Sequence, residues 1–587
     1  MTTGAPGAAK LPLDAPFVLL DDARPGGRAR LLTGLADTIV AYRPDEVEPA
    51  LERLRGAGEV AGFIAYEAGL ALEPKLAPLA RARAEGEPPL LWFGAFTRSE
   101  EVDAAALLPS PAGAWAGAPR PLIERDAYLA ALDRLHEHIL AGDIYQANFT
   151  FPADVPFAGH PAALYAGLRE RALAGHCALI FTGSHWILSL SPELFFTLDG
   201  GRVTTRPMKG TAARGGDPAA DAYAAEALAA DPKQRAENLM IVDLLRNDLS
   251  RVSEPGSVKV PELFAVETYP TVHQMVSSVT AQLEPGTDIA DLLRSLFPCG
   301  SITGAPKIRA MEIIAENEIA PRGVYCGAVG RIDGAGGADF NVAIRTLVAA
   351  AGESVARLGL GSGIVADSRG PEEWRECLAK GAFVASPVRF DLVETMRHDP
   401  LEGVVELDRH MERLRRSAEA LGFRFDRHQA RNELQAASFG AGHARVRLLL
   451  APGGAIAVEV RPLPAAPEEP VAVALAPLPV SPHDYRLRHK TSDRAFYDEA
   501  RAAGRTFEIL FTDPEGFLTE GSFTTLFVER DGQLLTPPLS RGLLPGILRE
   551  RLIADGRAIE AELTSADLQH GFLIGNAVRG LIKARLA

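Results

Sequence analysis

The pattern of hydrophobic and polar positions predicts helices and strands along the whole chain. Residues 126–142 predict a helix that begins at Asp126 and stops at Gly142, because the apolar residues between them recur at helical spacing. Residues 236–248 place Glu237 at the head of an otherwise apolar helical stripe, whereas RVTTRPMKGT (202–211) has the character of a partly buried strand. The Asp531-Gly532 pair between two strand-like runs predicts a tight hairpin.

Three stretches rich in proline, glycine or alanine interrupt this pattern. PSPAGAWAGAPRP (109–121) and RPLPAAPEEP (461–470) read as connectors, and the pattern begins afresh after SPVRFD (386–391). We therefore predict one domain over residues 1–385 and a second over residues 391–587. The connector at 461–470 divides the second domain into two lobes.

The composition narrows the class of protein. The chain has 587 residues, 47% of them hydrophobic and 23% charged, and a net charge of -15, which argues against nucleic-acid and anionic-membrane partners. No leader sequence or membrane span is expected. The four cysteines, with no CxxC spacing, favour a reducing cytoplasm and neither a disulfide framework nor a zinc site.

Acidic side chains head two of the predicted helices. Glu237 lies on the first, and Glu373 and Glu376 lie on the second, which covers residues 372–383. Two helices that each present carboxylates can jointly hold Mg²⁺, which takes oxygen ligands. A pair of solvated helices, with Glu376 and Lys380 as an i,i+4 ion pair, explains the same pattern and stays open.

Lys209 in RPMKGT has two interpretations. It is either a snorkelling surface lysine or a desolvated amine that can attack carbon. Further candidates for anion binding are the glycines of GLGSGIVADS (359–368), which precede an apolar strand-like run, and Arg345, which we expect in a mostly apolar strand with a carboxylate partner. That partner could belong to a substrate or to a structural salt bridge.

These motifs together resemble those of the chorismate-utilising enzymes. SPELFF with Glu193, RPMKGT with Lys209, Glu237, TVHQMVSS with His273, CGSITGAPK, AIRT with Arg345, GSGIVADS and the Glu376/Lys380 pair occur in the family's order and cover most of residues 1–385. The resemblance implies an α+β fold in which helices surround a two-sheet sandwich. A lysine at position 209 is similar to aminodeoxychorismate synthase component I, whereas anthranilate synthases carry alanine there.

The resemblance also implies roles for single residues. Lys209 would attack C2 of chorismate while the C4 hydroxyl leaves, with Glu193 as general acid and base and His273 orienting the ring. Mg²⁺ would be held by Glu237 and Glu376, with Glu373 beside them. The predicted substrate-binding residues are Ser301, Thr303, Gly304, Tyr325, Arg345, Gly361, Gly363 and Lys380. Gln234 departs from relatives that have an acid there, and Met208 replaces the commoner isoleucine.

Ammonia is the second expected substrate. Glutaminases of the triad type use a G-x-C-x-G elbow, and none of the four cysteines has this setting. The sequence therefore predicts a separate glutamine amidotransferase subunit as partner.

The C-terminal domain contains a second constellation. Lys490 lies just ahead of a predicted helix that Ser492 or Asp493 opens, Arg413 lies on another helix, and Pro545-Gly546 begins a third, where free N–H groups favour a phosphate. With Glu520 in GFLTEGSF, this set resembles the fold-type IV pyridoxal phosphate enzymes, which implies a two-lobed α/β domain.

In that family the lysine attaches to the cofactor and the acid contacts its pyridine nitrogen. Lys490 and Glu520 match these roles, and Arg413, Gly546 and Ile547 match the phosphate contacts, whereas Leu548 replaces a usual threonine. Thr395 in ETMR resembles a threonine that lyases place near the reacting C4. Members are commonly dimers, so the resemblance also implies a homodimer through this domain.

Fusion of the two domains indicates the function. Aminodeoxychorismate, the product of a synthase with this lysine, is the substrate of aminodeoxychorismate lyase, so we expect a bifunctional cytoplasmic enzyme that makes 4-aminobenzoate for folate synthesis. Two alternatives stay open. One is an anthranilate- or isochorismate-type synthase fused to a fold-type IV transaminase, and the other is a chain with one catalytically silent half.

Overall fold

The computed structural model of the chain describes residues 11–269 and 272–587. It divides into two compact units, the first made of residues 1–108, 118–155 and 165–384 and the second of residues 109–117, 156–164 and 385–587. The N-terminal stretch in which no leader sequence is expected lies partly outside the described residues. Thr271, the first residue of TVHQMVSS, also lies outside them. None of the described helices is long and apolar enough to cross a membrane.

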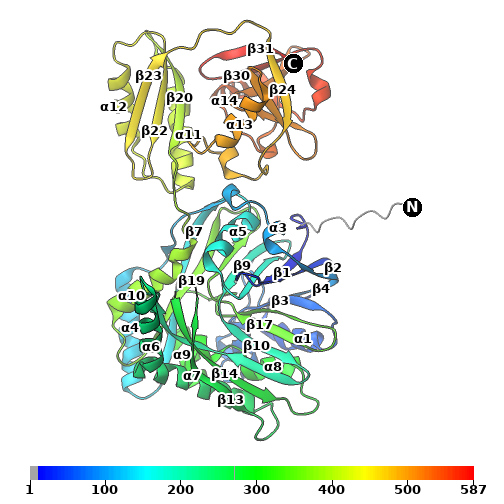
Figure 1. The fold of residues 1–587 in the computed structure, drawn as a ribbon, viewed down its shortest axis with the longest axis vertical. Coiled ribbons are helices and arrows are strands. Elements are labelled where there is room, and N and C mark those ends of the chain that lie inside the picture. The colour runs from blue at the N-terminus through cyan, green and yellow to red at the C-terminus, as the bar shows by residue number, and fades with distance from the viewer. Residues whose placement is uncertain (1–10, 270–271) are drawn as a thin grey trace, which may run out of the picture. The chain divides into compact units, whose positions relative to one another are not determined.

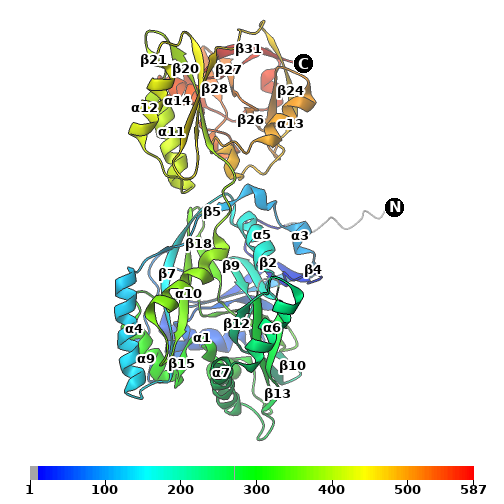
Figure 2. The ribbon, with the colours of Figure 1, turned by 60° about the vertical axis from the view of Figure 1, so that its left-hand side comes forward.

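Unit 1 is built around one hydrogen-bonded network of strands, so the layers of the predicted sandwich stay connected (Figures 1 and 2). Its strands are β1 Phe17–Asp21, β2 Ala29–Ala41, β3 Val60–Ile64, β4 Leu91–Val102, β6 Arg120–Pro121, β7 Gln146–Ala158, β8 His176–Phe181, β9 His185–Ser191, β10 Leu194–Asp199, β11 Arg202–Arg206, β12 Met208–Ala213, β13 Lys259–Thr268, β14 Val272–Gln282, β15 Gly304–Ala305, β16 Ala328–Ile332, β17 Ala338–Val342, β18 Thr346–Ala350 and β19 Val355–Ile364; the short β5 Trp115–Ala116 also pairs with β7, within unit 2.

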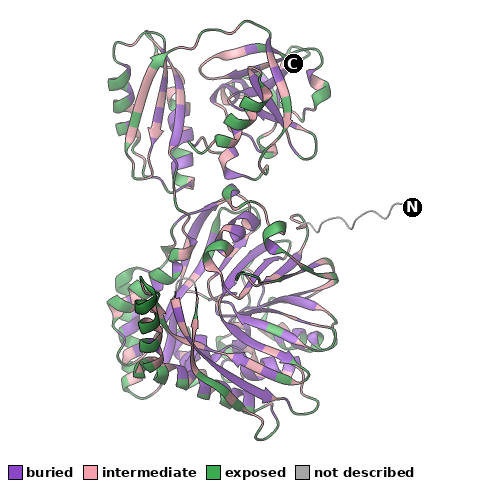
Figure 3. Ribbon diagram, in the orientation of Figure 1, coloured by how far each residue is buried: buried purple, intermediate pink, exposed green. Residues whose placement is uncertain are grey.

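Helices surround this network, as the sequence predicted. They are α1 Pro44–Leu54, α2 Ala68–Leu72, α3 Ala104–Leu107, α4 Arg125–Leu140, α5 Pro161–Ala172, α6 Pro218–Ala230, α7 Pro232–Ser250, α8 Ile289–Leu296, α9 Lys307–Asn317 and α10 Gly370–Gly381. Helices α4 and α10 pack together beside β19, and α6 and α7 pack against β12 and β14. Strands are mostly buried and the outer faces of helices exposed (Figure 3).

The predicted helix at 126–142 is present, with a different first residue. Helix α4 begins at Arg125 after Glu124, so Asp126 lies in its first turn and is not the N-cap. Its end agrees with the prediction, because Gly142 follows with a φ of 81°. Helix α7 buries Ile241 and Leu245 and leaves Glu237 half-buried, in line with the predicted stripe.

Unit 2 has two lobes, separated at the predicted connector 461–470. The first lobe is a four-stranded antiparallel sheet of β20 Leu392–Asp399, β21 Gly403–Val404, β22 Ala444–Leu450 and β23 Ile456–Pro462, with helices α11 Leu407–Ala420 and α12 Arg427–Ser438. The second lobe contains β24 Val471–Pro477, β25 Glu508–Thr512, β26 Leu518–Gly521, β27 Thr525–Arg530, β28 Gln533–Thr536, β29 Ala558–Glu560, β30 Phe572–Asn576, β31 Gly580–Leu586, α13 Ala495–Gly504 and α14 Ile547–Ala554.

The hairpin predicted at Asp531-Gly532 is confirmed. Arg530 pairs with Gln533 across a two-residue turn, and both turn residues have positive φ, of 52° and 79°. Asp531 tolerates this conformation better than most residues, and glycine adopts it without a steric cost.

Candidate active sites

Strand β12 holds Lys209 at a half-buried position in unit 1. The preceding strand-like run breaks at Pro207, and Gly210 follows with a φ of 95°, a conformation that an L side chain rarely adopts. Burial lowers the pKa of the Lys209 amine, and the Lys380 charge lowers it further, while Glu237, Glu193 and Glu376 oppose the shift. The structure therefore favours the desolvated amine over a snorkelling surface lysine.

Glu193 lies near Lys209 and is 4% exposed. Burial raises the pKa of this carboxyl to about 7, an effect that a hydrogen bond from Ser301 and the Lys209 charge offset in part. Its Oε1 atom is buried without a hydrogen-bond partner in the described part of the chain. A carboxyl that titrates near neutral pH can donate and accept a proton, as the predicted general acid and base must.

Gln146, at the start of β7, is a residue of this site that sequence reasoning missed. A Cβ on Gly363 would lie 3.0 Å from its Nε2 and 3.3 Å from Nζ of Lys209, so both side chains face the same glycine. Both polar atoms of the Gln146 amide are buried and have no partner among the described residues. Such a group is costly unless a ligand pairs with it.

The CGSITGAPK run lies beside β7. Gly304 pairs with Ala147 in register, and the Thr303 carbonyl accepts from the amide of Asn148. The Thr303 hydroxyl is buried and donates to backbone carbonyls of Cys299 and Gly300, 3.2 and 3.1 Å away. Ser301 and Thr303 are both buried, and Ser301 donates a hydrogen bond to Glu193.

The glycines of GLGSGIVADS lie within β19 rather than before a strand. Residues 359, 361 and 363 therefore share one face of this strand. A Cβ on Gly361 would clash with the Phe149 carbonyl at 2.6 Å, so β7 and β19 approach closely there. Lys380 donates to the Gly361 carbonyl over 3.0 Å and also pairs with Glu376 at 2.7 Å.

Arg345 differs from its prediction in backbone conformation. It lies between β17 and β18, not in a strand, and has a φ of 50°. No carboxylate pairs with it in the part of the chain that the structure describes, so the expected protein partner is absent there. Burial lowers the pKa of its guanidinium. A half-buried cation that has no carboxylate partner among the described residues is suited to a substrate carboxylate.

Two other predicted residues have different surroundings. His273, 2% exposed, contacts Asp221 through Nε2 at 2.9 Å and Thr268 through Nδ1 at 3.0 Å, so both ring nitrogens are engaged. The ring of Tyr325 packs on Gly359 and lines a cavity of about 490 Å³ whose lining includes neither Lys209 nor Glu193.

The acidic residues proposed for Mg²⁺ come from α7 and α10. Burial raises the pKa of Glu237, and Asp367 and Glu373 contribute in the same direction. Glu376 is paired with Lys380, as the ion-pair alternative expected, and no group of three potential ligands is gathered among the described side chains. The donors suit Mg²⁺ in chemistry, since all are carboxylate oxygens.

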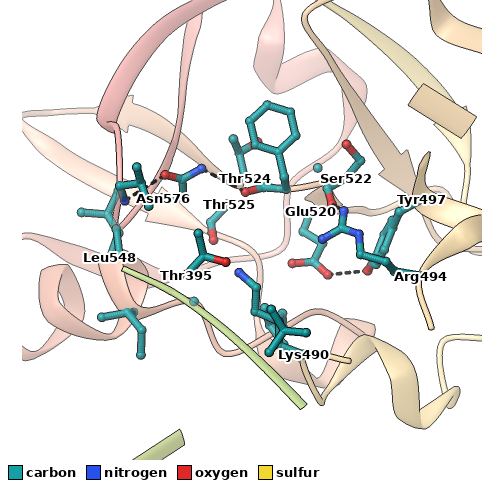
Figure 4. A pocket seen from close by; sticks show the side chains of 18 of the residues that line it. Thr395, Lys490, Arg494, Tyr497, Glu520, Ser522, Thr524, Thr525, Leu548 and Asn576 are labelled. Carbon is teal, nitrogen blue, oxygen red and sulfur yellow. Dashed lines mark hydrogen bonds between the residues drawn. The ribbon is translucent and has the colours of Figure 1, made fainter. Parts of the chain in front are cut away.

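Unit 2 contains a cavity of about 470 Å³, lined by residues of both lobes (Figure 4). Lys490 projects into it, and its backbone carbonyl is held to β20 by the Val393 amide at 2.8 Å. Burial and the Arg413 charge lower the pKa of the Lys490 amine to about 7, against the opposing charge of Glu394. The following helix begins at Ala495 after Arg494, so neither Ser492 nor Asp493 opens it.

Glu520 faces Lys490 from β26. Burial raises the pKa of its carboxyl to about 8, although Tyr497 donates a hydrogen bond to it over 2.6 Å. The Thr395 side chain also points towards the Lys490 amine (Figure 4). A cation beside Glu520, such as a protonated pyridine nitrogen, would compensate the burial of its charge.

The predicted phosphate cradle combines α11, α14 and β27. Arg413 donates to the Pro545 carbonyl at 3.0 Å, just before Gly546 and Ile547 begin α14. The Thr525 hydroxyl lies 2.8 Å from where a Cβ of Gly546 would be. It therefore places a hydroxyl at the predicted phosphate cradle, which the Leu548 side chain cannot do. Sequence reasoning missed Thr525 because this residue, the first of β27, lies 21 positions before Gly546 in the sequence.

Sequence reasoning also missed Glu394, on β20. Its buried carboxylate accepts from Nε and Nη2 of Arg413 at 2.8 and 2.6 Å and contacts Nδ1 of His410 at 2.6 Å. Arg413 lowers the pKa of Glu394 to about 2 despite its burial. These residues fit pyridoxal phosphate, because they include a half-buried lysine with a lowered pKa, an acid opposite it and a helix N-terminus with Arg413 beside it.

Comparison with known proteins agrees with this division. Residues 18–386 match the family model of chorismate binding enzymes, and residues 391–586 match that of class IV amino-transferases. The aminodeoxychorismate synthase component 1 of Klebsiella aerogenes is 45% identical over 261 residues, which are 44% of this chain and 57% of that protein. The anthranilate synthase component 1 of Streptomyces coelicolor is 44% identical over 44% of this chain and 50% of its own length.

The matched region spans about half the length of these relatives. Among solved structures, anthranilate synthase component I from Streptococcus pneumoniae covers 65% of this chain and 95% of its own, with a TM-score of 0.52 and 24% identity. The putative isochorismate synthase DhbC from Bacillus anthracis covers 63% and 95%, with a TM-score of 0.51 and 22% identity. Both share the fold.

Proposed function

This chain belongs to the family of chorismate binding enzymes, and because a class IV amino-transferase domain follows in the same chain, we propose that it makes 4-aminobenzoate from chorismate and ammonia in two steps. Unit 1 would form 4-amino-4-deoxychorismate, and unit 2 would release pyruvate from it. The observation that carries this proposal is the half-buried Lys209 side chain, whose desolvated amine faces Gly363 beside the buried Glu193.

In the first step, Lys209 would attack C2 of chorismate as the C4 hydroxyl leaves. Its lowered pKa supports this role, because only the neutral amine is a nucleophile. Glu193, with a pKa of about 7, would protonate the departing hydroxyl and take a proton from the ammonia that then adds at C4 and displaces Lys209. Arg345 would bind a substrate carboxylate, and Glu237 and Glu376, with Glu373 beside them, would hold Mg²⁺.

Ammonia would come from a separate glutaminase. All four cysteines of the chain are buried, and burial raises the pKa of each thiol, the opposite of what a cysteine nucleophile needs. This supports a partner subunit as the source. Free ammonium at high concentration would replace it in vitro.

In the second step, Lys490 and Glu520 would hold pyridoxal phosphate, with Arg413, Thr525 and the N–H groups of Gly546 and Ile547 at its phosphate. The cofactor supplies an electron sink when bound. Lys490, half neutral near pH 7, would take the proton from C4 of the substrate as pyruvate leaves. Thr395 points towards this amine and would orient the reacting group (Figure 4).

Incubation of the full chain with chorismate, ammonium, Mg²⁺ and pyridoxal phosphate tests the proposal. We expect 4-aminobenzoate and pyruvate, identified by chromatography. Lys209→Ala should stop this synthesis and leave conversion of supplied 4-amino-4-deoxychorismate intact, whereas the exposed Lys259→Ala should change neither. Anthranilate as product, or unchanged synthesis by Lys209→Ala, would refute the proposal.

A further inference from the structure

One face of the β20–β22–β23 sheet is cationic where it borders the cavity of unit 2. Along β22, Val446, Leu448 and Leu450 pack into the core of the first lobe. Arg445 and Arg447 alternate with them, so they lie on the opposite face, and both line the cavity that contains Lys490.

These two arginines lack the partners that neighbouring arginines have. The other arginines of the cavity wall all have an acceptor. Arg413 pairs with Glu394, and Arg486 pairs with Asp484. Arg494 and Arg501 both lie near Asp498, and Arg579 donates to the Ala465 carbonyl. Across the residues that the structure describes, no carboxylate or hydrogen-bond acceptor is recorded for the guanidinium of Arg445 or Arg447.

Cross-strand neighbours do not compensate these charges. Arg445 lies opposite Arg397 on β20 and opposite Arg461 on β23, and like charges in this position destabilise a sheet. Glu459 lies directly opposite Arg447, yet its carboxylate pairs with Arg461. The acids of the cavity wall are engaged as well, since Tyr497 donates to Glu520.

Half-buried guanidinium groups without counter-ions are expected where a ligand supplies the anion. We propose that Arg445 and Arg447 bind the two carboxylates of a substrate whose amine reaches Lys490, so that this site selects amines that carry two carboxylates. Residues i and i+2 of a strand are roughly 7 Å apart, which suits two carboxylates on one ring. This inference rests on the proposed function, in which unit 2 acts on an amine.

The test uses the full-length protein loaded with pyridoxal phosphate, so that the cofactor's visible absorbance reports on this cavity alone. Isophthalate, with two carboxylates, and benzoate, with one, are titrated into wild type, Arg445→Gln, Arg447→Gln and the double variant. Arg557→Gln is the control, because Arg557 is exposed and lies outside the cavity wall.

We expect wild type to bind isophthalate at least about 10-fold more tightly than benzoate. Each single variant should lose roughly 10-fold in isophthalate affinity. The double variant should lose the preference for isophthalate over benzoate. Arg557→Gln should behave as wild type. A wild-type spectrum that responds equally to both probes or to neither, or a double variant that keeps the preference, overturns the inference. Loss of cofactor affinity with the preference intact also overturns it, since the arginines would then serve the phosphate.

The same variants separate this inference from the proposed function. If wild type retains the arginine-dependent preference but forms no 4-aminobenzoate from 4-amino-4-deoxychorismate, the proposed lyase step fails and the dicarboxylate site stands. If wild type forms 4-aminobenzoate and the double variant does so with unchanged KM, the lyase step stands and the dicarboxylate site fails.

Discussion

Tyr497 donates its hydroxyl proton to the Glu520 carboxylate over 2.6 Å, in the wall of the cavity that also contains Lys490 (Figure 4). The hydrogen bond lowers the pKa of Glu520, but burial outweighs it and holds the value near 8. Without a cationic partner, this carboxyl therefore stays protonated at neutral pH. A cationic partner would make its ionised form the stable one.

The raised pKa of Glu520 predicts how the stability of the cofactor-free protein depends on pH. A carboxyl whose pKa is higher in the folded than in the unfolded chain stabilises the fold below its ordinary pKa of about 4.3, and this contribution is lost as pH rises through about 8. Glu520→Gln cannot ionise, so unfolding by urea should show it close to wild type at pH 5 and more stable at pH 8.5. Equal pH dependence of the two proteins would contradict the assignment.

Lys490 should be the lysine that attaches to the cofactor. Because the pKa of its amine is about 7, the rate of covalent incorporation of pyridoxal phosphate should rise with pH to a midpoint near 7 rather than near the ordinary lysine value. Borohydride reduction followed by peptide mapping measures this. Lys490→Ala should give no fixed cofactor, and the exposed Lys583→Ala should label normally. Label at another lysine would show that Lys490 is wrongly chosen.

Glu394 should stabilise unit 2 through Arg413 and His410. Loss of one charge from a buried ion pair typically costs about 3–5 kcal/mol, so Glu394→Gln should lower the free energy of unfolding by this order and weaken cofactor binding. The pKa of Glu394 is lowered to about 2, so its contribution is present above about pH 4.3 and is lost as pH falls towards 2. Unfolding of wild type and of Glu394→Gln at a series of acidic pH values measures both the loss of stability and its pH dependence. Glu419→Gln, at an exposed ion pair, is the control.

Gln146 should lower the stability of the ligand-free protein and contribute to substrate binding. Both polar atoms of its amide are buried and have no partner in the part of the chain that the structure describes. Gln146→Leu should therefore raise the free energy of unfolding by about 1–3 kcal/mol, the usual cost of an unpaired buried polar group. The same change should weaken chorismate binding, because the amide faces the glycine that Lys209 also faces. Calorimetric titration with chorismate and urea unfolding give the two quantities. Lower stability of Gln146→Leu together with an unchanged affinity for chorismate would exclude a ligand-binding role. Gln435→Leu, at an exposed position, is the control.

The sequence alone determined those features that depend on neighbours within one turn, strand or helix. Helical spacing predicted α7 with Glu237 on its stripe, and the Asp531-Gly532 pair predicted its hairpin, because both follow from local backbone preferences. The order of motifs along the chain similarly indicated Lys209 and Lys490 as the reactive amines.

Tertiary structure decided which side chains meet and which stay unpaired. Gln146 joins Lys209 only because β7 and β19 approach closely at Gly361, and Thr525 reaches Gly546 only through the fold of the second lobe. The conformation of Arg345 depends on its place at a strand end, and register decides that the guanidiniums of Arg445 and Arg447 have no carboxylate partner among the described residues. Burial then sets the pKa values of Glu193, Glu520 and both lysines, and burial is a property of the packed chain that no local pattern contains.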